Sequence, residues 1–234
     1  MKKMLWVSLA LAALIGSSLC ISERGNDVNN DLKPVLEISG TSAFELRKGD
    51  ILVRPNWGWL PGSSSSFEGR KFGHVAIVAE GASGNSVDEA LKKAQVIEAL
   101  FYDQATQKFQ FIKKDQIRET AASVSFGEKF KGIRYRLRLE LTNRQADSLI
   151  FFLHNQLNGG YNIFSSKKSA TQINERKKYF QMLKDENWHC TTLAWEAFRL
   201  TAGVDIDANR GLIVYPADIV AAPLFDLPGG RVRF

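Results

Sequence analysis

The sequence predicts an α+β protein in which a largely antiparallel sheet packs against helices. Short apolar or alternating segments, typical of strands, occupy the part of the chain after residue 40. Segments with helix-capping residues and one apolar face follow them. The 234 residues are 44% hydrophobic and 24% charged, which suits one folded domain, and we place it at residues 41–234.

The first residues resemble an export signal. A positive start, an apolar stretch over residues 4–15 and a run of small residues predict a signal peptide at residues 1–20. Cleavage after Ser18 and lipidation of Cys20 both remain open. Residues 21–40 are polar and are expected to form an N-terminal tether. We therefore expect an exported protein of the periplasm or cell envelope, in contact with membrane only through a lipid on Cys20.

Charge and hydropathy exclude two broad classes. The formal net charge is +6, without the concentrated basic face that nucleic-acid binding requires. No apolar run reaches the length of a bilayer-spanning helix. We expect neither a nucleic-acid partner nor a multispan membrane protein.

Strand signals dominate the first half of the mature chain. A turn at residues 44–50 precedes the first strand, and residues 55–73 read as a loop whose Trp57 and Trp59 could line a site. A turn at 81–85 and a capped helix at 86–95 follow. The predicted strands are 51–53, 74–79, 96–102, 109–112 and 135–141.

Helix signals dominate the second half. A capping sequence at 142–145 opens a helix that ends at Gly159. Its apolar face holds Ala146, Leu149, Ile150, Leu153 and Leu157. Residues 171–185 are predicted as a charged helix, and 188–200 as a buried helix that Gly203 stops.

Cys190 stands out because its only possible disulfide partner, Cys20, falls in the signal region. An unpaired cysteine is often a small buried hydrophobe. It can also be a nucleophile, and the predicted first turn of a helix favours an anion such as a thiolate. The unpaired N–H groups there could also hold an oxyanion.

A thiolate needs a proton acceptor, and the chain has three histidines. His154 reads as a surface or packing residue in mid-helix. His189 adjoins the cysteine in sequence, which makes a direct pair geometrically awkward. His74 opens a strand after a loop, so its ring could face a cleft. Glu98 lies in an apolar strand, where an unpaired carboxylate is unfavourable and an imidazole would compensate it.

Several ordered motifs together resemble the YiiX/YaeF-type permuted papain-like amidases, relatives of the NlpC-type cell-wall peptidases. The resemblance covers residues 45–220, and it implies a circularly permuted papain-like fold with the cysteine at a helix N-terminus. The motifs are Gly49-Asp50-Ile51-Leu52, Gly73-His74-Val75-Ala76-Ile77-Val78, Val96-Ile97-Glu98-Ala99, Gly160-Tyr161-Asn162, His189-Cys190-Thr191-Thr192-Leu193-Ala194-Trp195 and Tyr215-Pro216-Ala217-Asp218-Ile219.

The resemblance implies that Cys190 is the nucleophile, His74 the general base and Glu98 the residue that orients it. It also implies that Tyr161 lines the substrate cleft. The expected activity is cysteine-dependent hydrolysis of a small peptide or amide, such as a peptidoglycan stem peptide, with no metal and no cofactor. The excursion at 81–95 and the charged segment at 162–187 depart from the family pattern, so the substrate does not follow from the fold.

Three other readings remain open. Related permuted enzymes that resemble lecithin–retinol acyltransferase suggest a lipid or N-acyl amide substrate. A non-catalytic envelope-binding protein could keep the same fold. A metal site of His74, His189 and Cys190 is a further alternative, although their spacing is not that of a zinc site.

Overall fold

The computed structural model describes residues 36–55, 72–100, 102–103, 108–109, 116–207, 209 and 211–234. The expected signal peptide, Cys20 and residues 21–35 of the expected tether lie outside these ranges. So do Trp57 and Trp59 of the expected loop. Among the described residues, no helix combines the length and the apolar character needed to cross a bilayer.

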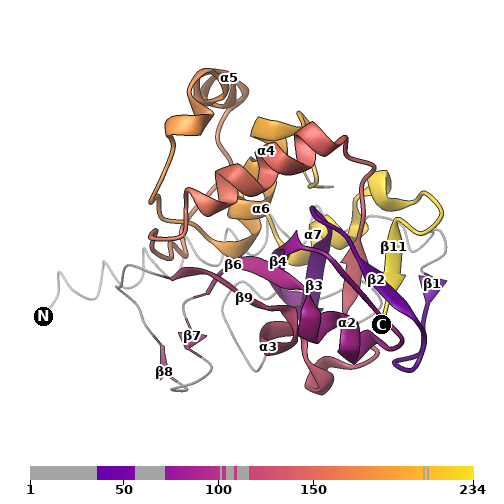
Figure 1. Ribbon diagram of the computed structural model, residues 1–234. Helices are drawn as coiled ribbons and strands as arrows, with labels where there is room; N and C mark the ends of the chain where they lie inside the picture. The colour runs from indigo at the N-terminus through magenta and orange to yellow at the C-terminus, as the bar shows by residue number, and fades with distance from the viewer. Residues whose placement is uncertain are drawn as a thin grey trace, which may run out of the picture.

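A seven-stranded sheet forms the centre of the protein (Figure 1). Its spatial order is β1-β11-β10-β3-β4-β6-β9. Every pairing in it is antiparallel except the parallel pair of β1 with β11. The strands are β1 Leu36–Glu37, β3 Ile51–Pro55, β4 Phe72–Glu80, β6 Gln95–Ala99, β9 Ile117–Ala121, β10 Tyr135–Leu137 and β11 Arg231–Arg233. Two small antiparallel pairs stand apart: β2 (Phe44–Leu46) with β5 (Ala82–Gly84), and β7 (Tyr102–Asp103) with β8 (Lys108–Phe109).

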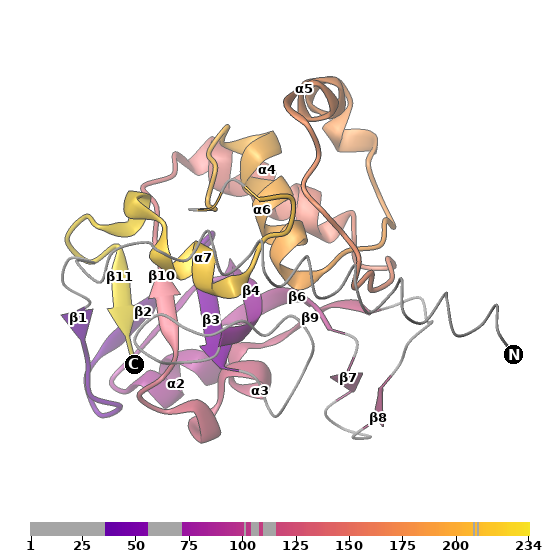
Figure 2. The same cartoon turned by 180° about the vertical axis from the view of Figure 1, so that it is seen from behind.

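Helices lie on both faces of this sheet (Figure 2). One face carries α4 (Asn143–His154), α5 (Ala170–Lys178), α6 (Cys190–Thr201) and α7 (Pro216–Ala221). The other carries α2 (Val87–Lys93) and α3 (Ala122–Phe126). Short 3-10 turns occur at Glu128–Phe130 (η2), Phe180–Met182 (η3) and Pro223–Phe225 (η4).

Two hydrophobic clusters follow from the alternation of side chains along the strands. Ile51, Val53 and Ile77 point to the cluster that holds α4, α6 and α7. Leu52 and Val78 point to the cluster that holds α2 and α3. The predicted α+β class with a largely antiparallel sheet is confirmed.

Several predicted elements have different bounds. The turn expected at 81–85 contains β5, because these residues pair with β2. The expected strand 135–141 stops at Leu137, and the next side chain, Arg138, binds Asp50. The charged helix ends at Lys178 rather than residue 185.

The order of strands and helices along the chain is also more mixed than the sequence predicted. The pairing of β9 with β6 and the insertion of β11 between β1 and β10 were not predicted, nor was α3. β1 falls inside the expected tether, so residues 36–37 belong to the sheet.

Candidate active site

Cys190 is the first residue of α6, and His189 caps this helix. The His189 side chain accepts a hydrogen bond from the backbone N–H of Thr191 at 3.4 Å. Burial lowers the pKa of His189 to about 4, so its ring is neutral and can accept this bond at physiological pH. The structure thus places His189 as a helix cap rather than as a base.

His74 lies near the start of β4 and interacts with the sulfur of Cys190. An interaction with the Cys190 side chain helps to raise the pKa of His74, and Nε2 of His74 lies 2.6 Å from Oε2 of Glu98 in β6. The Cys190 sulfur also lies 3.8 Å from Nδ1 of His189. With Nε2 held by the carboxylate, Nδ1 is the ring nitrogen that remains for the thiol. The ring stacks on Phe126 with centroids 5.9 Å apart, which fixes its plane.

Glu98 is almost completely buried at 1% exposure, and three side chains bind it through four hydrogen bonds. Arg118 of β9 reaches Oε1 through Nε at 2.9 Å and Nη2 at 2.8 Å. Ser125 of α3 donates to the same oxygen at 2.7 Å, while His74 contacts the other oxygen. Burial alone would raise the pKa of Glu98, but His74, Arg118 and Ser125 together lower it to about 2. Glu98 is therefore an ionised carboxylate.

The charge state of His74 depends on its burial and on three neighbouring residues. Burial and the positive charge of Arg54 lower the pKa of His74, whereas the hydrogen bonds to Cys190 and Glu98 and the charge of Glu98 raise it. The net shift is upward, so the surroundings favour the imidazolium form. An imidazolium next to a thiol at a helix N-terminus is the arrangement that stabilises a thiolate.

Tyr161 approaches the sulfur from the segment before α5. Its side chain makes a hydrogen bond to Cys190, and burial, followed by the charge at Cys190, raises its pKa well above 10. Its ring lies 5.4 Å from that of His189, and its backbone forms a parallel bridge with Trp188. The tyrosine is thus a neutral hydrogen-bond donor at the sulfur.

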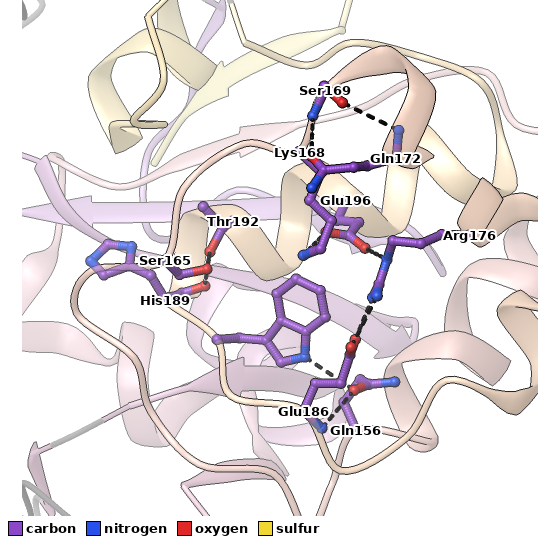
Figure 3. A network of polar contacts seen from close by, with 11 residues as sticks. Gln156, Ser165, Lys168, Ser169, Gln172, Arg176, Glu186, His189, Thr192 and Glu196 are labelled. Carbon is purple, nitrogen blue, oxygen red and sulfur yellow. Dashed lines mark hydrogen bonds and ion pairs between the residues drawn. The ribbon is translucent and has the colours of Figure 1, made fainter. Parts of the chain in front are cut away.

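A polar network holds the segment that precedes Cys190 (Figure 3). Glu196 of α6 is buried and binds Lys168 at 2.7 Å and Arg176 of α5. Arg176 also binds Glu186, just before the cysteine. Burial raises the pKa of Glu196 despite these two cations. The network fixes α5 and the incoming chain against α6, on the side of α6 away from the sheet.

The structure brings Cys190, His74, Glu98 and Tyr161 together, and their roles in catalysis and binding stay predictions. His154 stands apart on the surface, where it contacts Glu119 at 3.1 Å. No group of three or more His, Cys, Asp or Glu side chains within the described ranges could hold a metal ion.

Three neighbours of the site were not predicted from the sequence. Arg118 and Ser125 bind Glu98, and Arg54 acts on Cys190 through its charge. Residues 117–121 (IRETA) show no clear apolar–polar alternation, so the local sequence does not indicate Arg118. Nothing in the local sequence indicates Ser125 or Arg54.

Comparison with known proteins gives one local likeness. Over 34 residues the chain is 56% identical to the uncharacterized protein YycO of Bacillus subtilis (strain 168). The match covers 14% of this chain and 14% of YycO, so the matched part spans about one seventh of that relative. No family model and no solved structure matches the chain. The likeness suggests a relation to YycO-like proteins and assigns no activity.

Proposed function

We propose that this protein is an exported cysteine amidase or peptidase of the cell envelope with a circularly permuted papain-like fold. The observation that carries the proposal is the chain of contacts from Cys190 through His74 to the ionised Glu98. The order along the chain supports the fold: a strand with histidine, a strand with glutamate and then a helix with cysteine. Export rests on the sequence of residues 1–20.

The mechanism is acyl transfer to a thiol. The Cys190 thiolate attacks the amide carbonyl, and the first N–H groups of α6 other than that of Thr191, which His189 caps, receive the oxyanion. The His74 imidazolium gives its proton to the leaving nitrogen as the C–N bond breaks. Water deprotonated by His74 then attacks the thioester and releases the acid. Glu98 orients the ring and stabilises its charged form.

The low exposure of Cys190 limits which molecules can reach its sulfur. Cys190 is 4% exposed, and apolar side chains of β4, β6 and α6 border it on the sheet side. An extended substrate must therefore approach from the side of Tyr161 and the α6 N-terminus. A small peptide or amide, such as a peptidoglycan stem peptide, suits this approach.

A thiol-directed reagent tests the nucleophile. Iodoacetamide should alkylate Cys190 of the folded protein faster than that of the unfolded chain, and His74→Ala should remove the difference. His154→Ala is the matched control, because this histidine also contacts a glutamate but lies on the surface. Equal rates in the folded and unfolded protein would favour a non-catalytic envelope-binding protein.

A lipid or N-acyl amide substrate is the second candidate, and one observation favours it. Phe164 and Leu212 are 77% and 74% exposed, on segments that meet where Lys167 N–H donates to the Leu212 carbonyl at 2.8 Å. Both segments bind the first turn of α6, through Ser165 to Thr192 and through Val214 to Thr191. Exposed apolar side chains thus lie on segments that contact the first turn of α6. Incubation with muropeptides and with N-acyl amides, with Cys190→Ser as the blank, separates the two substrates.

A further inference from the structure

Arg54 is a buried cation beside the candidate active site that the triad does not explain. It lies in β3, paired with His74 of β4, and is 4% exposed. Nη1 donates to the carbonyl of Pro55 at 2.9 Å, and the guanidinium lies 4.6 Å from the centroid of the Phe130 ring. Its Nε is buried and has no hydrogen-bond partner among the described residues.

Within the described part of the chain Arg54 has no hydrogen bond to an anion, although the charges of Glu98 and Cys190 favour its cationic form. Burial lowers its pKa to about 10, so the side chain stays charged at neutral pH. The nearby carboxylate is Glu98, whose Oε1 binds Arg118 and Ser125 and whose Oε2 binds His74. A buried cation without a hydrogen-bonded anion is strongly unfavourable unless an anion arrives from outside.

Arg54 lies where its positive charge can influence the proposed reaction. Its charge acts on both Cys190 and His74. Lys129 lies over the same Phe130 ring, with Nζ 5.0 Å from the centroid, and adds a second positive charge. The region next to the sulfur on the β3 side is therefore positive, and it attracts an anionic part of a bound molecule.

We propose that Arg54 binds a substrate carboxylate on the leaving-group side of the scissile amide. The inference rests on the proposed function and names its substrate class: N-acyl amino acids, or peptides cleaved before their C-terminal residue. Arg54 pairs across the sheet with His74, the residue that protonates the leaving nitrogen. In an amino acid the carboxylate is attached to the carbon that bears this nitrogen, so one residue can contact His74 and Arg54 together.

The reaction balances without a further reagent. The Cys190 sulfur bonds to the carbonyl carbon, the C–N bond breaks, and His74 transfers one proton to the nitrogen. The free amino acid leaves with its carboxylate released from Arg54. Water then cleaves the thioester, so one water is consumed for each amide.

Alkylation with two reagents tests the anion site without a substrate. Iodoacetate and iodoacetamide differ in one charge, so the ratio of their rates at Cys190 reports attraction of a carboxylate. We expect this ratio to exceed that of the unfolded chain by tenfold or more, and Arg54→Gln to lower it by about the same factor. Arg136→Gln is the control: Arg136 is also buried, in β10, with two unpartnered nitrogens, but its charge acts on Asp50 instead. An unchanged ratio in Arg54→Gln would overturn the proposal.

Hydrolysis locates the carboxylate relative to the scissile bond. We expect the protein to cleave N-acetyl-Ala-Ala with a higher kcat/KM than N-acetyl-Ala-Ala-amide, and Arg54→Gln to abolish this preference, read as the ratio of the two kcat/KM values. Equal cleavage of both peptides by the unchanged protein would refute the substrate class and leave the hydrolase proposal standing. If the protein cleaves neither peptide but still reacts preferentially with iodoacetate, peptide hydrolysis and the leaving-side assignment are refuted. The anion site is retained in that case.

Discussion

Replacement of Glu98 by glutamine tests the central pair of the candidate site. The amide keeps the size of the side chain and a hydrogen-bonding oxygen, but it removes the negative charge that His74 and Arg118 share. The imidazolium form of His74 should lose part of its stabilisation. The Cys190 thiolate, which depends on that imidazolium, should become less populated at neutral pH.

The structure gives the size of the effect. The pKa of Glu98 falls from 4.5 to about 2, which corresponds to about 3 kcal/mol in favour of the carboxylate after the cost of its burial. His74 is the strongest favourable partner, and Arg118 and Ser125 take the remainder. Loss of a hydrogen bond to a charged group costs about 1.5–3 kcal/mol, so the rate of alkylation should fall about tenfold or more.

The assay is the rate of Cys190 alkylation by iodoacetamide between pH 5 and pH 9. The loss in Glu98→Gln should be greatest just above pH 6.5, because the raised folded pKa of His74 keeps its ring charged there with the help of the carboxylate. It should shrink toward pH 9, where thiols ionise without an imidazolium. Glu119→Gln, which alters a glutamate paired with the surface His154, is the control. A uniform loss at every pH, or none, would refute the reasoning.

Three further predictions concern stability and support of the site. Ser125→Ala removes one hydrogen bond to an ionised carboxylate, so urea unfolding should show a loss of about 1.5–3 kcal/mol, with a smaller effect on alkylation than Glu98→Gln. Phe198→Ala should cost about 3–5 kcal/mol in the same measurement, since this ring is fully buried; a loss below about 1 kcal/mol would show that the core collapses around it. Burial, then the charge of Asp207, raises the pKa of Asp218 to about 7. The folded state therefore holds a proton that the unfolded chain releases near pH 4, and stability should fall by up to about 4 kcal/mol as pH rises from 4 to 7. Asp218→Asn should flatten this part of the pH–stability curve, and an unchanged slope would assign it to other groups.

Elements with strong local signals were predictable. The helix α4 begins where its Thr142 and Gln145 form the expected capping box, and its buried side chains include Ala146, Leu149 and Leu153. α6 carries a continuous apolar sequence and begins two residues later than expected, because Trp188 forms a bridge with Tyr161 instead of a helical turn.

Elements that depend on distant partners were not predictable. β11 has the sequence Arg231-Val232-Arg233, which has no apolar alternation beyond its centre, and it becomes a strand through hydrogen bonding with β1 and β10. The residues that bind Glu98 were not predictable for the same reason. Arg118 belongs to a strand that pairs with β6, and the sequence distance of 20 residues carries no periodic signal.

The separation of the candidate residues along the chain has a consequence for timing. His74 and Glu98 are made long before Cys190, yet neither can activate it until β4, β6 and α6 are packed together. Because such contacts between remote segments form late in folding, the thiol stays latent through synthesis and any passage in an unfolded state. The Cys190 thiol therefore becomes reactive only when the tertiary structure is complete.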